Sequence, residues 1–307
     1  MYIVLDNRPD RMGANLTWYI MQIVYAHKNK WFVHYYGSPF DKSIFFKAIH
    51  NFVNKYNKAL GDELGSHDHL WRTYIIDINE QDWPGNNMKV CLNIQQDIVS
   101  YYYEHLYTDM MACFNSVVAD NLHIFRDMPQ LNLKKTIAVH MRLDDIADRA
   151  PYDGVHSTEY YRQKLDRGNI AINLNEEQAF FRDRGIHVPS YGRHYNPYDC
   201  QAPIEEQKVQ EYIDTAKKAF PDHDVVIVTS PISKVTLPYP VIKSTNADTD
   251  LFIISKADVL ICSKSLFCFS ALYFGQSHMR YIPMWGHIAG TGLTSKYDMT
   301  KNHVYIY

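Results

Sequence analysis

A cluster of charged side chains follows a short apolar run at residues 137–145, which read IAVHMRLDD. The apolar residues of this run are typical of a buried strand, and His140 and Arg142 stand at its end. In α/β proteins, ligands bind at the carboxyl ends of the strands. A guanidinium group binds a phosphate through two parallel hydrogen bonds without a metal ion. The run therefore predicts an anion site built around Arg142, with His140 as a further hydrogen-bonding group.

Three aspartates close behind Arg142 are candidates for a catalytic base, because a carboxylate can take the proton of an attacking hydroxyl. They are Asp144, Asp145 and Asp148. With an arginine to stabilise a departing diphosphate, they are suited to group transfer from a sugar nucleotide. The alternative interpretation is a strand end with a surface ion pair, and the motif by itself is compatible with both.

A second segment, residues 248–275, has the pattern of a short helix, a strand over residues 259–262 and a helix that begins near Ser265. The first turn of a helix presents free backbone N–H groups and the positive end of the helix dipole. A phosphate group can therefore bind at the turn that contains Ser265.

The two segments together resemble the GDP-fucose-dependent fucosyltransferases, a superfamily that includes the α1,2, core α1,6 and protein O-fucosyltransferases. The similarity lies in H-x-R-x-x-D at residues 140–145 and in D-x(6)-A-D-x-L-x-C-x-x-S at residues 250–265. Residues 156–160, HSTEY, are also similar to the His-Pro-x-Glu-x-Tyr stretch of the α1,6 branch. The resemblance covers mainly residues 137–275.

The amino terminus adds a further point of similarity. Residues 2–5 predict a short strand, residues 11–16 a glycine-containing loop, and the apolar residues that follow recur at helical spacing. This order resembles the Gly-x-Gly-Asn-Gln opening of the same superfamily, of which Gly13 and Asn15 remain. By that resemblance both residues belong to the donor site, and Gly13 lets the opposite domain approach. From the residues alone, a plain turn is the alternative.

The resemblance implies an inverting, metal-independent glycosyltransferase that transfers L-fucose from GDP-fucose to a glycan hydroxyl and needs no cofactor. It also implies an α/β fold of two facing Rossmann-like domains, the GT-B arrangement, with the substrates in the cleft between them. The expected domains are residues 1–130 on the acceptor side and residues 131–307 on the donor side. Independently, the alternating strand and helix candidates of the second half predict a parallel sheet covered by helices.

Matched residue by residue, the resemblance implies a role for each group of the donor site. Arg142 would bind the diphosphate, and His140 would line the nucleotide site. Asp250 would bind guanine, whose N1–H and amino group are a matched pair of donors for two carboxylate oxygens. Ser265 and the backbone N–H of Leu266 would meet the β-phosphate.

Among the aspartates, Asp145 occupies the position of the family's motif aspartate and is the first candidate for the base. That aspartate can also serve structure by pairing with basic neighbours, and in that case Asp148 is the next candidate. Neighbouring residues of an extended loop point in alternate directions, so Asp144 and Asp145 should not both face the acceptor.

The chain departs from the family at three positions near the phosphates. Leu143 replaces a second arginine, Ile146 a frequent basic residue and Leu266 a second serine. Because these changes reduce the positive charge around the diphosphate, two alternatives stay open. One is a GT-B transferase that uses another UDP- or GDP-linked hexose or pentose, and the other is a sugar-binding module without turnover.

The composition is that of a globular enzyme, with 307 residues of which 46% are hydrophobic and 21% charged. Thirty-one basic and 34 acidic residues give a net charge of −3, which does not attract the chain to nucleic acid or to an anionic membrane. No apolar run approaches the ~18 residues of a membrane span. We expect a cytoplasmic enzyme of the bacterial or viral type that binds a nucleotide sugar and a glycan acceptor. Its oligomeric state is left open.

Metal and disulfide chemistry are not indicated. Asp248 and Asp250 form the Asp-x-Asp pattern of metal-dependent GT-A enzymes, but here the pattern opens a helix late in the chain, and we interpret it as unrelated to metal binding. The 15 histidines include no H-E-x-x-H motif. The five cysteines include no C-x-x-C pair and are expected to be reduced thiols.

Periodicity predicts the remaining elements and one long insertion. Helices are expected over residues 40–60, 91–125, 158–166 and 204–220 and near residue 250, and strands over residues 71–78, 136–141, 225–229, 279–283 and 303–307. The tyrosines of residues 101–107 are interpreted as a packed helix face, and the domain junction is expected within residues 126–135. For the polar and aromatic insertion at residues 168–203, a functional lid and a solvated loop are equal alternatives.

Overall fold

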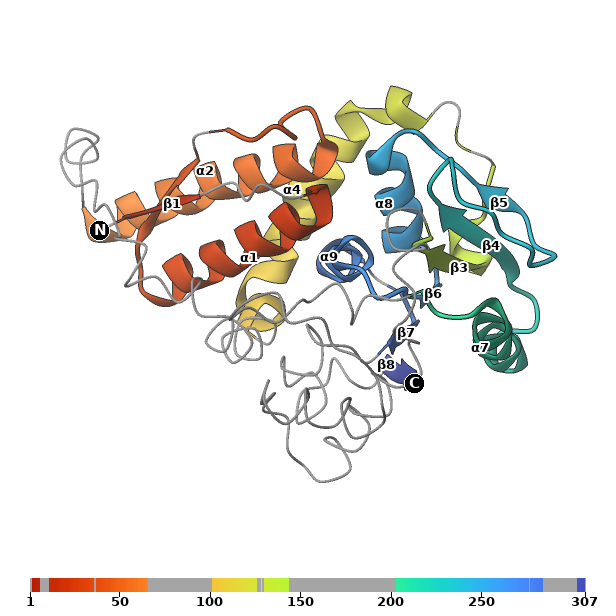
Figure 1. The fold of residues 1–307 in the computed structure, drawn as a ribbon. Helices are drawn as coiled ribbons and strands as arrows, with labels where there is room; N and C mark the ends of the chain where they lie inside the picture. The colour runs from red at the N-terminus through yellow and green to blue at the C-terminus, as the bar shows by residue number, and fades with distance from the viewer. Residues whose placement is uncertain are drawn as a thin grey trace, which may run out of the picture. The chain divides into compact units, whose positions relative to one another are not determined.

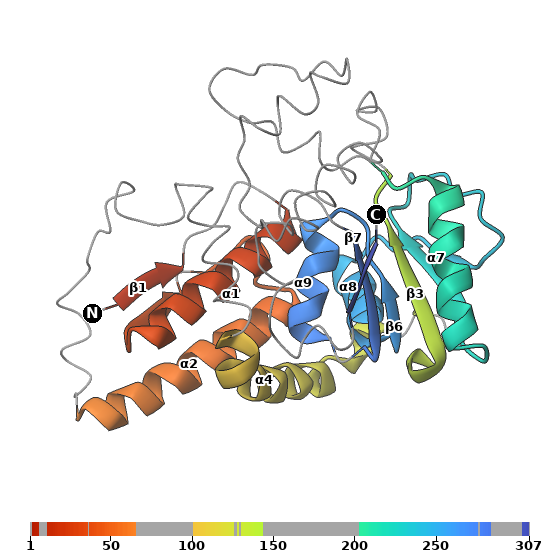
Figure 2. The same ribbon diagram turned by 90° about the horizontal axis from the view of Figure 1, so that it is seen from below.

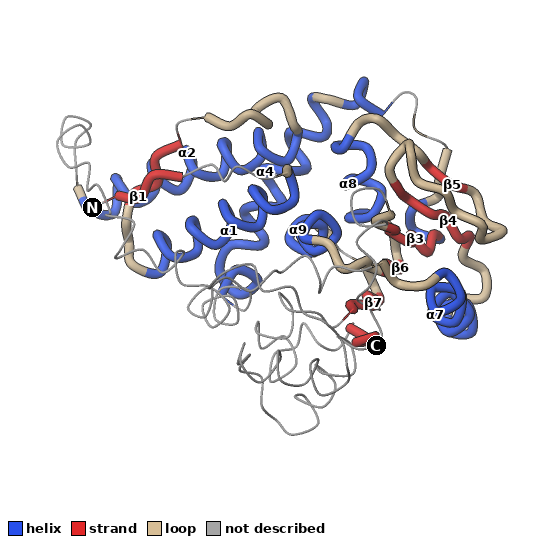
Figure 3. Tube along the Cα trace, in the orientation of Figure 1, coloured by secondary structure: helices blue, strands red, loops and turns tan. Residues whose placement is uncertain are grey.

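The computed structural model describes residues 2–5, 11–35, 37–65, 101–125, 128, 130–143, 203–275, 277–283 and 303–306. The chain divides into two compact units, Met1–Met128 and Pro129–Tyr307. Figure 1 labels their helices and strands, and Figure 3 distinguishes them by colour. The predicted strand at residues 71–78, the helix at residues 158–166 and the insertion at residues 168–203, except for its last residue, lie outside the described residues.

The first unit contains a two-stranded parallel sheet and a group of helices. Strands β1 (Tyr2–Leu5) and β2 (Phe32–Tyr35) pair in parallel and are joined by α1 (Met12–Lys28). The other helical elements are α2 (Ile44–Leu64), η3 (Tyr102–Leu106), α4 (Tyr107–Asp120) and η4 (Leu122–Phe125). The strand predicted at residues 2–5 is confirmed, whereas the sequence pattern gave no sign of β2.

Helix α2 shows why its sequence folds as predicted. Ser43 caps its start, because the hydroxyl accepts a hydrogen bond from the backbone N–H of Phe45 at 3.2 Å. Gly65 ends it with φ of 60°, a left-handed conformation that favours glycine. The predicted apolar face is buried, and its members are Phe45, Ile49, Phe52 and Val53.

The interpretation of residues 11–16 as a glycine loop is wrong, because α1 already begins at Met12. Gly13 is the second residue of this helix, and the Asn15 side chain donates to the carbonyl of Arg11 at 3.2 Å. A glycine near a helix start destabilises the helix by no more than about 1 kcal/mol. Burial of the helix outweighs this cost, since Leu16 and Ile20 are completely buried.

The second unit is built on a six-stranded sheet in which every paired neighbour is parallel. Its strands are β3 (Thr136–Met141), β4 (Asp224–Thr229), β5 (Val241–Ile242), β6 (Val259–Ile261), β7 (Met279–Pro283) and β8 (His303–Ile306). The predicted α/β class with a parallel sheet is therefore confirmed for this unit. The two-residue β5 was too short to be predicted from its sequence.

The order of the strands locates a ligand-binding position. The sheet has the order β5-β4-β3-β6-β7-β8, so the chain starts at the central β3, moves outward to β5, and returns to the other side of β3 at β6. Renumbered within the unit, this is the order 3-2-1-4-5-6 of doubly wound dinucleotide-binding folds. The direction reverses between β3 and β6. In such sheets ligands bind in the crevice outside the carboxyl ends of the strands at this reversal.

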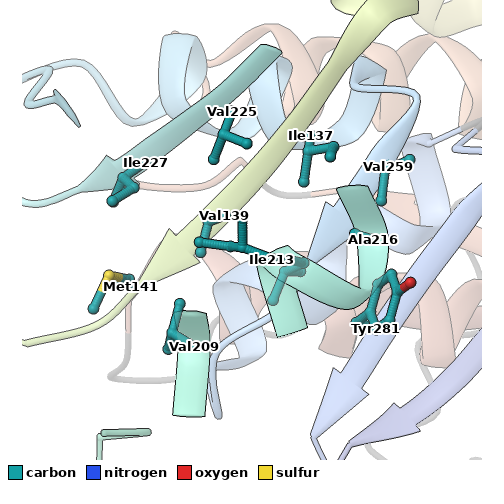
Figure 4. Close-up of a cluster of buried hydrophobic side chains, with 11 residues drawn as sticks. Ile137, Val139, Met141, Val209, Ile213, Ala216, Val225, Ile227, Val259 and Tyr281 are labelled. Carbon is teal, nitrogen blue, oxygen red and sulfur yellow. The ribbon is translucent and has the colours of Figure 1, made fainter. Parts of the chain in front are cut away.

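Helices cover both faces of this sheet. On one face, α7 (Glu206–Ala219) packs against Ile137 and Val139 of β3 through a cluster of buried side chains, which Figure 4 shows. The other face is covered by α8 (Ala247–Lys256) and α9 (Leu266–Phe274), as the view in Figure 2 shows. Because successive side chains of a strand point to opposite faces, His140 lies on the face away from α7.

Two findings apply to the described residues as a whole. No helix in the described part of the chain is long and apolar enough to cross a lipid bilayer. The three described cysteines, Cys113, Cys262 and Cys268, are free thiols.

Candidate functional site

The two strands at the reversal are linked by their own side chains. His140, near the end of β3, places its ring Nδ1 2.6 Å from the hydroxyl of Ser263, which follows β6. Both side chains are buried. The parallel pairing of Val139 with Ile261 sets this approach, because it brings the two strands to a common end. The hydrogen bond therefore links the ends of the two strands between which the strand order reverses.

His140 is a neutral hydrogen-bonding group. Burial lowers the pKa of His140, and the positive charge of Arg142 acts in the same direction, so that together they bring it to about 3. The ring also lies 5.6 Å from the ring of Phe267 in α9. An imidazole in this state can orient a ligand or the Ser263 hydroxyl, but it adds no positive charge to the site.

Arg142 supplies positive charge at the same strand end. It stands one residue beyond β3, is partly exposed, and lies close enough to His140 to affect its pKa. The turn after β6 carries a second cation, Lys264, whose side chain is only 3% exposed. Arg142 combines nearness to the reversal with exposure, so it is the better placed of the two to bind an incoming anion.

The turn between β6 and α9 has the geometry of a capped helix start. Ser265 is the N-cap of α9 in an extended conformation, and its hydroxyl accepts the backbone N–H of Phe267 at 3.2 Å. Its backbone N–H donates to the carbonyl of Ser263 at 2.8 Å. A hydroxyl that accepts one hydrogen bond still has its own hydrogen to donate to a phosphate oxygen. Leu266 is the first residue of the helix, as the sequence predicted.

Asp250 lies in the first turn of α8, the helix that follows β5, and its surroundings are unusual for a carboxylate. Its buried Oδ1 has no hydrogen-bond partner among the described residues. Burial raises the pKa of Asp250 to about 7, and no neighbouring charge contributes to the shift. A buried carboxyl group without a partner destabilises a fold. Such a group is typical of positions that receive hydrogen bonds from a ligand.

Some predicted site residues are not placed with this group. Asp144, Asp145 and Asp148 lie outside the described residues. Gly13 and Asn15 belong to the first unit, within α1, and not to a loop. Within the ranges that the structure covers, no group of three or more His, Cys, Asp or Glu side chains could hold a metal ion.

The sequence analysis missed Ser263 and Lys264. Both stand between a predicted strand and a predicted helix, in the run Ser263-Lys264-Ser265. Such a polar turn at the carboxyl end of a strand is the signal that could have indicated them. The bond between Ser263 and His140 joins residues 123 positions apart in the sequence, which no local pattern reveals.

Comparison of the chain with protein-family models, with curated proteins and with solved structures finds no match. The geometry therefore defines only a class of site. At the reversal of the doubly wound parallel sheet it brings together a neutral histidine, a nearby arginine and a capped helix start, and the first turn of α8 carries Asp250, whose buried Oδ1 has no partner among the described residues.

Proposed function

We propose that the protein is an inverting, metal-independent glycosyltransferase that transfers L-fucose from GDP-fucose to a glycan hydroxyl. One observation carries the proposal, namely the hydrogen bond between His140 and Ser263 beside Arg142. It joins the two sequence segments that resemble the fucosyltransferases at the point of the sheet where nucleotides bind in doubly wound folds.

The chemistry requires positive charge at the leaving group. The acceptor oxygen attacks the anomeric carbon, the bond from that carbon to the diphosphate breaks, and negative charge develops on the departing GDP. Arg142 can stabilise this charge through two hydrogen bonds, and the N–H of Leu266 and the hydroxyl of Ser265 can meet the β-phosphate. Neutral His140 holds the Ser263 turn in place. These groups perform the task that a metal ion has in other transferases.

Recognition of guanine is the task proposed for Asp250. The guanine N1–H and amino group can donate to both carboxylate oxygens and would give the buried Oδ1 the partner that the described residues do not supply. Because burial raises the pKa of Asp250 to about 7, guanine would bind more weakly as the pH falls below that value. Uracil lacks this pair of donors, so UDP should bind with no such dependence.

The acceptor and the base complete the proposal. The first unit would bind the glycan acceptor, and the two units would face each other as Rossmann-like domains in the GT-B arrangement. The proton of the acceptor hydroxyl would pass to an aspartate close behind Arg142. Asp145 is the first candidate, and Asp148 follows if Asp145 serves structure.

A different nucleotide sugar is the second candidate for the donor. Leu143 is a partly exposed residue next to Arg142 that replaces the family's second arginine, and Leu266 offers only its backbone N–H. Fewer groups can therefore bind the phosphates than in the family. This difference would favour a UDP- or GDP-linked hexose or pentose as the donor, or binding of a sugar without turnover.

A panel of nucleotide sugars tests the proposal directly. GDP-fucose, GDP-mannose, UDP-glucose and UDP-xylose are incubated with the protein and mixed glycans, and release of nucleotide and transfer of sugar are measured. The expected result is transfer from GDP-fucose alone. Transfer from another donor would contradict GDP-fucose as the substrate. Tight binding of a sugar without any transfer would contradict the proposed transferase activity. Asp→Asn variants of Asp144, Asp145 and Asp148 then identify the base as the change that lowers kcat with donor affinity unchanged.

A further inference from the structure

One aspartate links the starts of four strands of the second unit. Asp258 immediately precedes β6, and its two carboxylate oxygens accept hydrogen bonds from two histidine rings. His223 Nε2 lies 2.7 Å from Oδ2, and His278 Nδ1 lies 2.6 Å from Oδ1. His223 immediately precedes β4, and His278 immediately precedes β7. This Asp258 cluster lies at the opposite end of the strands from the candidate functional site.

The backbone of Asp258 adds two further links. Its N–H donates to the carbonyl of Leu133 at 2.8 Å, in the short helical turn η5 (Leu133–Lys135) that leads into β3. Its carbonyl accepts the N–H of His278 at 2.6 Å. One residue is thus bonded to the segments that begin β3, β4 and β7, and it stands itself at the start of β6.

Strand β6 needs such an anchor because it is short. It has three residues, and each of its two ladders has three paired positions. A shift of one residue would move every side chain of a strand to the other face of the sheet. For β6 that shift would remove Ser263 from His140. The Asp258 cluster holds one end of β6, and the bond between Ser263 and His140 holds the other.

We propose that Asp258 is a positioning residue, which fixes the register of β6 and thereby places the turn of residues 263–267 for the phosphates of the ligand. This inference deepens the proposed function and rests on it for the identity of the ligand. Asp258 belongs to the sequence pattern that resembles the fucosyltransferases, and among the described residues its hydrogen bonds are with the segments that begin neighbouring strands.

The two histidines support Asp258 unequally. Side-chain exposure is 14% for His223 and 76% for His278. His223 uses Nε2 toward Asp258, and its buried Nδ1 has no partner in the described part of the chain. Burial by itself would raise the pKa of Asp258, but the hydrogen bonds and charges of the two rings outweigh burial and hold it below its usual value. The carboxylate is therefore charged and fully bonded, which suits a fixed anchor.

Amide hydrogen exchange and ligand affinity together test the proposal. In Asp258→Ala, the amides of residues 263–267 should exchange at least about tenfold faster, whereas those of α7 should keep their rates. Affinity for inorganic pyrophosphate and for GDP should fall about 10- to 100-fold, because small displacements of binding groups have large effects. Affinity for guanosine, which has no phosphate, should change little.

Matched variants separate positioning from simple stability. Asp258→Asn keeps an acceptor for His223 and can donate to the exposed ring of His278, so it should rescue most of the affinity. Asp224→Ala removes an exposed carboxylate from the same edge of the sheet and should have no effect. His278→Ala removes only the exposed link and should give intermediate changes in amide exchange and pyrophosphate affinity. It replaces Asp258→Ala in the test if that variant does not fold.

Two results would overturn the inference. One is a uniform increase in exchange across the whole sheet with pyrophosphate affinity unchanged, which would make Asp258 a general stabilising residue. The other is simple additivity of Asp258→Ala and Ser263→Ala in affinity, since two changes that act through one turn should be coupled. If the wild-type protein binds neither GDP nor pyrophosphate, the proposed function fails, and the exchange measurement alone still decides whether Asp258 fixes the turn.

Discussion

Histidine and aspartate side chains lie at both ends of the strands in the second unit, but their hydrogen bonding differs between the two ends. At the amino edge, both carboxylate oxygens of Asp258 accept hydrogen bonds from histidine rings. On the side of the carboxyl ends, His140 pairs with the uncharged hydroxyl of Ser263, and the buried Oδ1 of Asp250 has no partner among the described residues. The carboxylate at one edge is paired with two histidine rings, whereas on the other side one carboxylate oxygen has no partner among the described residues.

The pKa values of the two aspartates express this difference. Burial raises the pKa of Asp250 to about 7. Burial acts in the same direction on Asp258, but its two histidine partners outweigh it and lower the pKa. A partly buried carboxyl group is thus destabilising when charged at Asp250, where one buried oxygen has no partner among the described residues, and stabilising at Asp258, where two histidine rings pair with it. Polar groups that weaken a fold in this way are typical of functional sites.

The largest effect should come from Arg142→Ala. Loss of the guanidinium should remove about 2 to 4 kcal/mol of transition-state stabilisation, or roughly 30- to 1,000-fold in rate, with little change in melting temperature. Arg142→Lys keeps the charge but not the paired hydrogen bonds and should recover only part of the rate. Lys218→Ala removes an exposed cation from the end of α7 and serves as the control. Turnover like that of the wild type in Arg142→Ala would contradict the assignment of the site.

Asp250→Asn should raise the free energy of unfolding and should remove the preference for GDP over UDP. The pKa of Asp250 is raised in the folded state, so ionisation of its carboxyl group reduces stability as the pH rises from about 4 to about 7. The variant avoids this loss and should gain about 1 to 3 kcal/mol at pH 8, and almost nothing at about pH 3, below the unfolded value. Urea unfolding at the two pH values measures the gain, with the exposed Asp222→Asn as the control.

The same variant tests recognition of the base. At 100 times its dissociation constant, GDP adds about 2.7 kcal/mol to the stability of the wild-type protein, which a shift in melting temperature reports. UDP at the same concentration should add much less, and Asp250→Asn should lose the difference. A variant that keeps its preference for GDP would separate Asp250 from guanine recognition.

Asp258 should show the opposite dependence on pH. A lowered pKa contributes stability above the unfolded value of about 3.9, and that contribution is lost as the pH falls through the folded value. Stability of the wild-type protein should therefore decline below about pH 4 more steeply than that of Asp258→Asn. Urea unfolding between about pH 2 and pH 5 compares the two proteins. Parallel curves would mean that the two histidines do not stabilise the charged form.

The sequence revealed the sheet of the second unit well because its strands are buried on both faces. Residues 136–141 and 279–283 are mostly apolar, although they include His140 and Arg280, and both strands lie where the pattern predicted. The order of the strands could not be predicted, because β5 has only two residues and pairs with β4 through contacts that local sequence does not specify.

Several residues of the candidate site were predicted one by one, but Ser263, Lys264 and the contacts within the site were not. His140, Arg142 and Ser265 were identified, since strand ends and helix starts leave local signals. The pairing of His140 with Ser263 depends on the register of two distant strands, and the cap formed by Ser265 depends on the backbone angles of the turn. Gly13 was misread because a glycine in the first turn of a helix looks the same in sequence as one in a loop.

Ser265 should show a smaller and mixed effect, because its hydroxyl already serves the fold. Ser265→Ala removes the cap of α9 and should lower the free energy of unfolding by about 1 kcal/mol. It should also weaken binding of pyrophosphate several-fold. Ser270→Ala is the matched control, since that buried hydroxyl lies in the same helix and donates to the carbonyl of Phe267 at 2.7 Å. Equal losses of pyrophosphate affinity in both variants would make the role of Ser265 purely structural.

The smallest expected effect is that of chelation, which should leave transfer unchanged. In the proposed function, Arg142 and the start of α9 would supply positive charge and N–H donors for the departing diphosphate. A cation would be redundant there, so the rate with EDTA should equal the rate without it. The assay is repeated with Mn²⁺ added back after chelation. Complete loss of activity that Mn²⁺ restores would instead make Asp248 and Asp250 metal ligands. In that case the unpartnered oxygen of Asp250 would be explained by a cation and not by guanine, and Asp250→Asn would abolish the response to Mn²⁺ as well as transfer.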